Sequence, residues 1–369
     1  MCVKLLHCGD LHLEAPFASL SDADGRPDQR RQELKRMLGS IVELADAEQV
    51  DLLLVCGDLY EHGYAKKSTL HFICDQFRKI PEIPVLIIPG NHDPATPDSF
   101  YCNFDWPSNV HILKEDNIFY EHSATGARVY GCLPLTGKLD EAGINIFMFH
   151  GTVDMPFSTD AFQPASSAEL ETYGFDYCAM GHFHTRIQGA GAERRIYNAG
   201  SPEPLGFDEE GEHGVFITTI EKQPGENSTI QAVFKGLNLR QFVNLDVQTG
   251  GCLNDEQAAF RAAAAMEGAG SKEDLFRISL QGYITHDFKI DTGYIASLLR
   301  TKAFYARIMD HTIPDYDFEQ ISKEPGLRGL FVRKMLDRAA KAPGDKDRRL
   351  VMQALYYGME AIDEGSICV

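Results

Sequence analysis

The sequence predicts an α/β protein whose strands are buried on both faces and alternate with helices. Three observations lead to this fold class: short apolar runs that end in polar residues, helical periodicity between the first three runs, and a later change to a β-rich pattern. The apolar runs occupy positions 3–8, 51–56, 85–88, 144–149 and 176–180. Continuous runs of this length, bounded by glycine, are typical of strands covered on both sides.

Helical segments lie between the first three runs. Residues 27–48 carry an apolar stripe with a 3.6-residue period, formed by Leu34, Met37, Leu38, Ile41, Val42 and Ala45. Residues 66–79 form a second predicted helix, and residues 195–247 turn β-rich. Strand–helix–strand repetition predicts a layered domain that carries its functional residues at the carboxyl ends of strands.

A second region begins near Gly250-Gly251, although a start near Arg240 fits the pattern as well. It alternates helix (254–266), strand (275–283), helix (292–299) and strand (304–309), and two helices (327–341 and 346–362) finish the chain. We therefore predict three parts: a first domain at 1–238, a smaller α+β domain at 239–322 and a helical segment at 323–369.

The composition is that of a globular protein, with 44% hydrophobic and 24% charged residues. No apolar run approaches the roughly 20 residues of a membrane span, and the N-terminal stretch lacks the features of a signal peptide. The nine cysteines are scattered singly, as expected of reduced thiols. We therefore expect a cytoplasmic protein without a membrane partner.

The net charge of −19 disfavours a protein that coats nucleic acid. The charge is uneven, however, because residues 322–349 hold nine Lys and Arg against four acids. An acidic chain can still act on a phosphate polymer when metal ions supply the local positive charge. Charge alone therefore leaves a nucleic-acid substrate open.

Polar side chains follow each of the five apolar runs. The motifs are D-L-H, G-D, G-N-H-D, H-G and G-H-F-H, and they supply Asp10, His12, Asp58, Asn91, His92, Asp93, His150, His182 and His184. Because parallel strands deliver their carboxyl ends to one edge of a sheet, these side chains should converge. Carboxylate, amide and imidazole groups without thiolate suit Mn, Fe, Zn or Mg, and so many ligands suit two ions that share a carboxylate.

Each motif alone is a weak signal, because D-x-H arises by chance and G-D often marks only a turn. Histidines outside the motifs are interpreted as core or surface residues: His7, His62, His71, His111, His122, His213, His286 and His311. The ordered set of five motifs is what indicates a site.

In this order and at these spacings, the motifs resemble the calcineurin-like metallophosphoesterases over roughly residues 1–235. The opening V-K-L-L-H-C-G-D-L-H-L-E-A-P-F and the Y-N-A-G-S-P at 197–202 are similar, more narrowly, to SbcD-type DNA repair exonucleases, especially the bacterial YhaO branch. The resemblance implies a four-layer αββα sandwich, in which two packed mixed sheets are flanked by helices. It also implies a smaller α+β capping domain and C-terminal helices.

The resemblance further implies seven metal ligands in two groups joined by a bridge. One metal would be held by Asp10, His12 and His184, the other by Asn91, His150 and His182, and both by Asp58. His92 would face the scissile phosphate and stabilise its charge or protonate the departing oxygen. Asp93 would orient His92 or its loop. The metals would be two divalent ions, with Mn²⁺ as first choice and Fe, Zn or Mg as alternatives.

One position departs from the family pattern. SbcD-type nucleases usually carry a His three residues after the bridging Asp, in G-D-L-F-H, whereas this chain reads G-D-L-Y-E-H with Glu61 at that place. The substitution leaves the metal ligands intact but puts exonuclease-like handling of the substrate in doubt. Either His62 acts from the adjacent position or that contribution is lost.

The leading hypothesis is a two-metal phosphodiesterase that hydrolyses DNA in repair, as an exonuclease or endonuclease. By resemblance, residues 239–322 would cap the site and contact DNA, and the C-terminal helices would bind the coiled coil of an SbcC-like SMC-type ATPase. The stretch 327–341 fits a partner-binding helix and equally a helix packed on its own domain. The sequence does not decide whether the chain forms a homodimer.

Two alternatives compete with this hypothesis. The first is a phosphatase or small-molecule phosphodiesterase of the same superfamily. It is disfavoured because G-D-L-Y-E-H-G lacks the Asp-Arg pair of the protein phosphatases. The second is a non-catalytic scaffold, which is disfavoured because all seven expected ligands are present.

Overall fold

The structure is a computed structural model that describes residues 1–20, 25–115, 117–131, 139–140, 142–155, 162–223 and 225–364. The chain divides into two compact units, Met1–Val243 and Asn244–Val369. Our division into three parts at residues 238 and 322 stays a prediction. Among the described helices, none combines the length and the apolar character needed to cross a bilayer.

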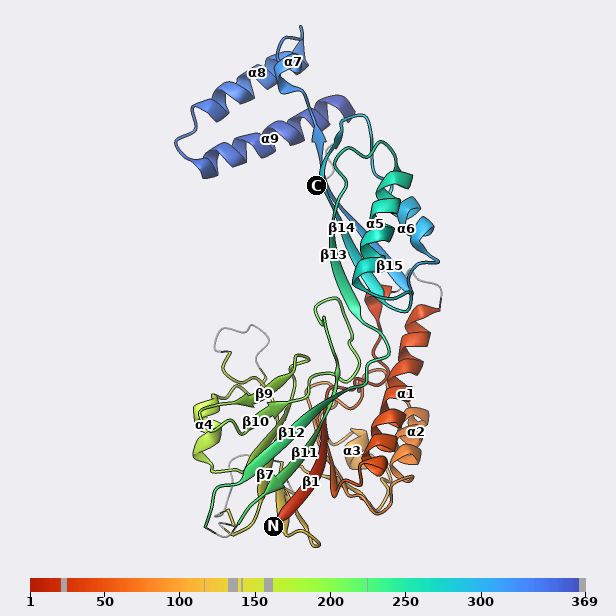
Figure 1. The fold of residues 1–369 in the computed structure, drawn as a ribbon, viewed down its shortest axis with the longest axis vertical. Helices are drawn as coiled ribbons and strands as arrows, with labels where there is room; N and C mark the ends of the chain where they lie inside the picture. Colours follow the sequence, from red (N-terminus) through yellow and green to blue (C-terminus); the bar gives the residue numbers. More distant parts are fainter. Residues whose placement is uncertain are drawn as a thin grey trace. The chain divides into compact units, whose positions relative to one another are not determined.

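Within the described residues, the first unit holds two six-stranded mixed sheets (Figure 1). The first sheet has the order β12-β11-β1-β2-β3-β4, formed by Thr229–Gly236, Gly214–Glu221, Cys2–Cys8, Leu52–Cys56, Val85–Ile88 and Val110–Ile112. Strands β1 to β4 are parallel, and β11 and β12 extend the sheet antiparallel. Parallel strands need cover on both faces, which explains their unbroken apolar runs.

The second sheet has the order β5-β6-β7-β8-β10-β9, formed by Phe119–His122, Ala127–Tyr130, Asn145–His150, Tyr177–Gly181, Ile196–Asn198 and Ile187–Ala190. Its four inner strands are parallel, and β5 and β9 pair antiparallel with their neighbours. The two sheets pack face to face through a buried cluster that includes Leu5, Leu54, Leu86, Ile146, Met148 and Ala179. This packing aligns the carboxyl ends of β1, β2 and β3 with those of β7 and β8.

Helices form the outer layers of this unit. Helix α1 (Arg26–Ala47) carries Pro27 in its first turn, buries the predicted apolar stripe, and runs beside α2 (Lys67–Phe77) along the first sheet (Figure 1). On the second sheet, α4 (Ser167–Thr172) contributes Leu170 to an outer cluster with Phe147 and Phe175. Short helical turns at η1 (Ala18–Leu20) and α3 (Phe100–Asn103) lie in loops. The predicted class, an α/β fold with two packed mixed sheets and flanking helices, is confirmed.

In its described part, the second unit has a three-stranded sheet ordered β13-β14-β15, formed by Phe242–Gln248, Leu275–Thr285 and Tyr305–Asp315. Its helices are α5 (Asp255–Ala269), α6 (Thr292–Leu299), α7 (Phe318–Ile321), α8 (Leu327–Ala340) and α9 (Asp345–Glu364). Helices α8 and α9 pack through Val332, Leu355 and Met359. Strands β14 and β15 extend beyond the predicted strands, because they pair in parallel over all eleven residues despite the polar positions near their ends.

Candidate metal centre

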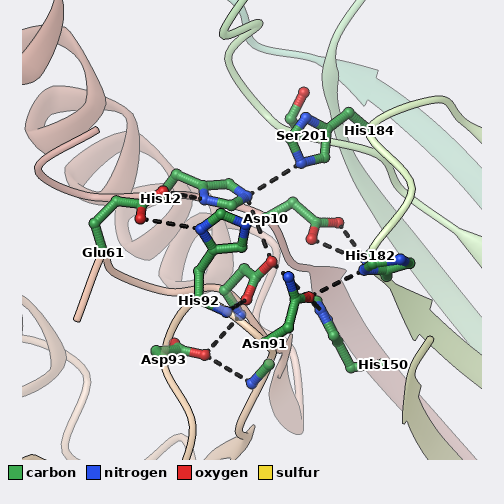
Figure 2. A network of polar contacts seen from close by, with 12 residues as sticks. Asp10, His12, Glu61, Asn91, His92, Asp93, His150, His182, His184 and Ser201 are labelled. Carbon is green, nitrogen blue, oxygen red and sulfur yellow. Dashed lines mark hydrogen bonds and ion pairs between the residues drawn. The ribbon is translucent and has the colours of Figure 1, made fainter. Parts of the chain in front are cut away.

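The nine predicted site residues all lie at strand ends of the first unit. Asp10 and His12 follow β1, Asp58 follows β2, and the Asn91–Asp93 triplet follows β3. From the second sheet, His150 ends β7, and His182 and His184 follow β8. Figure 2 shows that side chains from both sheets point toward one another.

The backbone at this edge is strained. Four of the predicted metal ligands have a positive backbone angle φ, which residues other than glycine rarely adopt. They are Asp10 (52°), His12 (45°), Asp58 (51°) and His182 (95°). Such conformations cost about 1–3 kcal/mol each and persist only where the surrounding structure enforces them. Their concentration at one edge indicates a functional site rather than ordinary turns.

Three glycines allow the strand ends to approach one another. A Cβ atom added at Gly57 would collide with the ring of His150, and one at Gly90 would collide with the carboxylate of Asp58. A Cβ at Gly181 would overlap the carbonyl oxygen of Cys56. The glycine in the G-D, G-N-H-D and G-H-F-H motifs is therefore required by close packing as well as by turn geometry.

Asp10, His12 and His184 form one group, whose ligand atoms all lie within 4.8 Å of one another. The Nε2 atoms of His12 and His184 face each other at 3.1 Å. The Asp10 carboxylate accepts the backbone N–H of His182 at 3.0 Å, which links this group to the next. Asp10 and His12 are buried, so the group is shielded from bulk water on the side of β1.

Asn91, His150 and His182 form the second group. The amide oxygen of Asn91 lies 2.9 Å from Nε2 of His150 and 3.1 Å from Nδ1 of His182. Asp58 stands between the two groups, because its Oδ2 lies 3.5 Å from Nε2 of His12 and 3.3 Å from Nε2 of His150. One carboxylate oxygen thus reaches both groups, as the predicted bridge requires.

Further acceptors fix the outward-facing nitrogens of these histidines. Nδ1 of His12 lies 2.8 Å from Oε1 of Glu61, and Nδ1 of His184 lies 2.7 Å from Oε1 of Glu209. Nδ1 of His150 lies 2.8 Å from the carbonyl oxygen of Cys56. Because carboxylate and carbonyl oxygens only accept, each Nδ1 donates, and in the neutral ring Nε2 then carries a lone pair.

Acceptor atoms consequently face acceptor atoms inside the site. The lone pairs of His12 and His184 point at each other, and that of His150 points at the oxygens of Asn91 and Asp58. Such an arrangement is stable only when a proton or a cation lies between the acceptors. Oxygen and imidazole donors without thiolate, grouped around a shared carboxylate, fit two divalent ions.

The electrostatics show the same preference for positive charge. Burial would lower the pKa of His150, but the hydrogen bond to Asp58 and the charges of Asp10 and Asp58 raise it to about 9. Burial would likewise lower the pKa of His184, but the hydrogen bond to Glu209 and the charges of Asp10, Glu209 and Asp58 together raise it to about 9. Burial would raise the pKa of Asp58, yet the surrounding histidines hold it below its usual range. The field that favours imidazolium here also favours a bound cation.

His92 lies beside the metal-ligand groups and is more accessible, with 45% of its side chain exposed. Its ring packs edge-on against His12 at a centroid distance of 4.7 Å, and its Nδ1 lies 3.0 Å from Oε2 of Glu61. This hydrogen bond raises the pKa of His92. Burial alone would raise the pKa of Glu61, but its bonds with both histidines bring it down to about 2.

Asp93 is fully buried and holds two loops together. Its carboxylate accepts backbone N–H groups of Gly90 and Leu59, each at 2.7 Å, and the hydroxyl of Tyr101 at 2.6 Å. Burial raises its pKa to about 6. These bonds connect the loop of Asn91 and His92 to the loop of Asp58, and the role of Asp93 in orienting His92 or its loop stays a prediction.

Sequence reasoning missed Glu209 and did not foresee the contacts of Glu61. Glu209 stands in F-D-E-E, an acidic run typical of an exposed loop, yet it is buried and bonded to His184. Glu61 stands out in the sequence only as a departure from the family pattern, whereas it binds two site histidines. His62 joins the region through its backbone, donating its N–H to the carbonyl of His92 at 3.0 Å. Whether His62 replaces the family histidine stays a prediction.

Two mixed sheets with a histidine- and carboxylate-rich edge define a metallophosphoesterase, and comparison with known families agrees. Residues 3–186, which contain all seven predicted ligands, match the calcineurin-like phosphoesterase family. The chain therefore carries a calcineurin-like metallophosphoesterase domain over residues 3–186.

Its relatives include the metallophosphoesterase YhaO of Bacillus subtilis, itself uncharacterized, which is 28% identical over 59% of this chain and 57% of its own length. The DNA double-strand break repair protein Mre11 of Methanopyrus kandleri is 25% identical over 60% and 54%. The SbcD component of the nuclease SbcCD of Escherichia coli K12 is 26% identical over 63% and 71%. The predicted resemblance to the SbcD-type branch near YhaO is confirmed, although the match spans little more than half of YhaO and Mre11.

Proposed function

We propose that this protein is a two-metal-dependent phosphodiesterase that hydrolyses phosphodiester bonds in DNA. One observation carries the proposal: a single oxygen of Asp58 is shared by two groups of inward-facing acceptors. Two ions about 3.5–4 Å apart around such a bridge suit in-line displacement at phosphorus. The DNA substrate is supported by the relatives, of which one is part of a nuclease and another is a DNA repair protein.

The residues that would hold the ions follow from the two groups. Asp10, His12 and His184 would bind one, Asn91, His150 and His182 the other, and Asp58 both. When bound, the ions would supply a water nucleophile and neutralise charge on the phosphate. Mn²⁺ is our first choice because the family resemblance implies it, and Fe, Zn and Mg are the alternatives because mixed oxygen and imidazole ligation suits them as well.

His92 supplies the proton chemistry in this proposal. With Nδ1 held by Glu61, Nε2 is the nitrogen available to a substrate at the exposed side of the ring. From there it would stabilise charge on the scissile phosphate or protonate the departing oxygen. Asp93 would maintain the loop that carries His92, because it joins that loop to the one following β2.

The C-terminal helices are proposed to contact a partner. Leu327 and Leu330 of α8 and Leu350 of α9 are exposed, although leucine is usually buried. Exposed leucines on a helical hairpin suit docking onto an apolar helix surface, such as the coiled coil of an SbcC-like SMC-type ATPase. Residues 239–322 are proposed to contact DNA and cap the site. Formation of a homodimer is compatible with this proposal but is not required by it.

The function is tested with a nuclease assay on free-ended and end-blocked DNA over a panel of divalent metals, with and without the candidate ATPase. We expect metal-dependent cleavage, strongest with Mn²⁺. Hydrolysis of nitrophenyl phosphomonoesters without any DNA cleavage would instead assign a phosphatase. Binding of DNA or the ATPase without any hydrolysis would assign a scaffold.

The partner is tested by deleting residues 326–369 and measuring co-purification with the ATPase. Loss of co-purification is expected, while metal binding and basal cleavage should persist because the ligands lie in the first unit. Undiminished co-purification would show that the C-terminal helices do not form the interface with the ATPase.

A further inference from the structure

In the two ligand groups of the proposed metal centre, different kinds of oxygen accept the Nδ1–H of His12 and His184 on one side and of His150 on the other. In the Asp10 group, both histidines donate Nδ1–H to glutamates, His12 to Glu61 and His184 to Glu209, at 2.8 and 2.7 Å. In the other group, His150 donates to the neutral carbonyl of Cys56 at 2.8 Å. That group also contains Asn91, a neutral amide, where the first group has the carboxylate of Asp10.

A carboxylate behind a histidine strengthens metal binding in two ways. It fixes the tautomer that turns the Nε2 lone pair inward, and it adds a negative charge that makes the imidazole a stronger donor. A backbone carbonyl fixes the tautomer but adds no net charge. Since Glu61 and Glu209 are largely buried, with 14% and 8% of their side chains exposed, water screens their charges little.

We propose that Glu61 and Glu209 are positioning residues that make the Asp10–His12–His184 position the tighter of the two metal positions. The Asn91–His150–His182 position is then the weaker and more readily exchanged one. This inference rests on the proposed two-metal centre and adds an order of affinity that the ligand set alone does not give.

The second oxygen of each glutamate is already occupied, which holds the carboxylate in place. Oε2 of Glu209 accepts the Ser201 hydroxyl at 2.7 Å and the Leu205 N–H at 3.1 Å. Oε2 of Glu61 lies 3.0 Å from Nδ1 of His92. Glu61 thereby joins the tighter position to His92 through one side chain, and neither glutamate has to move for its histidine to bind metal.

Glu61 could instead act as a ligand, because His12, Glu61 and His92 also offer atoms within 4.8 Å of one another. The distances from Glu61 to the two rings, 2.8 and 3.0 Å, are those of hydrogen bonds. Moreover, Nε2 of His12 already converges with Nε2 of His184 on the other side of the ring. Counting bound ions separates the two roles.

The test is a Mn²⁺ titration of the metal-free full chain, in which electron paramagnetic resonance measures free Mn²⁺. The wild type should bind two ions per chain in two affinity classes. Glu61→Gln and Glu209→Gln keep the side-chain shape, remove the charge and offer an N–H₂ that lets Nδ1 accept, which moves the ring proton onto Nε2. Each should weaken the tighter class by about 10–100-fold and leave the weaker class unchanged.

Two further variants complete the design. Asn91→Ala should weaken only the weaker class, which assigns that class to its position. Glu212→Gln removes a charge from an exposed side chain after Glu209 and should change neither class. Because Glu61 and Glu209 lie on separate loops, either variant tests the inference if the other fails to fold.

The inference is overturned if both glutamine variants leave the tighter class unchanged, or if they weaken only the weaker class. Binding of three ions by the wild type and two by Glu61→Gln would make Glu61 a ligand, which also overturns it. Failure of the wild type to bind any of Mn²⁺, Fe²⁺, Zn²⁺ and Mg²⁺ would remove the proposed function itself. Two bound ions with unaltered classes in the variants would remove only this inference.

Discussion

The strand-end edge of the first unit and the C-terminal helices of the second both depart from the usual pattern of burial, but in opposite directions. At the edge, charged and polar side chains are buried, and Asp10, Asp58 and His150 are at most 2% exposed. On the helices, apolar side chains are exposed, with Leu327 at 71% and Leu350 at 65%. Buried polar groups are informative exceptions in a folded chain, and exposed apolar groups become informative where they gather in a patch. The buried polar groups form the candidate metal centre, and the exposed leucines lie on the surface that we propose to contact a partner.

Asp58→Ala should have the largest effect at the edge. It removes the oxygen shared by both ligand groups, so both ions should bind more weakly and hydrolysis should fall by about a thousandfold or more, as expected when several kcal/mol of charge stabilisation is lost. Metal content and the rate of DNA cleavage measure this. Asp46→Ala, on the exposed side of α1, is the control. Wild-type metal content in Asp58→Ala would show that the two groups act independently.

His92→Ala should separate catalysis from metal binding. We expect the turnover rate to fall by about 10²–10⁴-fold, because a general acid contributes that much, while two ions remain bound. Single-turnover cleavage and metal content at the same pH measure the two effects. Near-full activity in this variant would contradict the role assigned to His92.

Because of the buried side chain of His7, the stability of the folded chain should depend measurably on pH. The ring is fully buried, donates Nε2–H to the Met180 carbonyl at 2.8 Å and contacts the Tyr177 hydroxyl at 3.0 Å. Burial lowers its pKa from 6.5 to about 4. Below pH 6.5 the unfolded chain therefore takes up a proton that the folded chain does not. The stability due to neutral His7 is complete above pH 6.5 and is lost as the pH falls toward 4.

At pH 5 this loss should be about 2 kcal/mol of unfolding free energy. In His7→Gln, stability should depend less on pH between 6.5 and 4. Urea unfolding followed by the fluorescence of Trp106, which is the single tryptophan of the chain and lies in the first unit, measures the difference. Equal slopes in the two proteins would mean that His7 is protonated in the folded state.

The smallest expected change in stability concerns the exposed leucines. Leu350→Ala should alter the unfolding free energy by no more than about 0.5 kcal/mol but weaken binding to the ATPase. Leu355→Ala on the same helix removes a fully buried side chain and should destabilise α8 and α9 by about 2–5 kcal/mol. Hydrogen exchange of the two helices and co-purification measure both effects. A large loss of unfolding free energy in Leu350→Ala would show that Leu350 stabilises the fold and is not reserved for a partner.

The fold and the ligands could be predicted because their signals are local. Apolar runs between glycines define the parallel strands, and a strand end followed by Asp, Asn or His is visible within a few residues. Topology then brings those ends together without further information. The predicted α/β class and family resemblance are confirmed, and the seven ligands converge as expected, although their roles as ligands stay predictions.

The residues behind the ligands could not be predicted in the same way. Glu61 meets His12 across 49 positions of sequence, and Glu209 meets His184 across 25. Neither pair lies within one element, so no periodicity relates the partners. An acid in F-D-E-E is expected to be solvated, and only the packing of the loop around Ser201 buries Glu209. Such contacts depend on the three-dimensional path of the loops, which no local sequence pattern describes.

The positive φ angles at Asp10, His12, Asp58 and His182 have a consequence for how this chain can change. Glycine adopts such angles without strain, so Asp10→Gly would relieve part of a local cost of about 1–3 kcal/mol while it destroys the metal position. Thermal robustness and activity therefore make opposing demands at this edge. Replacing any of these four residues by glycine is therefore expected to relieve backbone strain while it removes a proposed metal ligand.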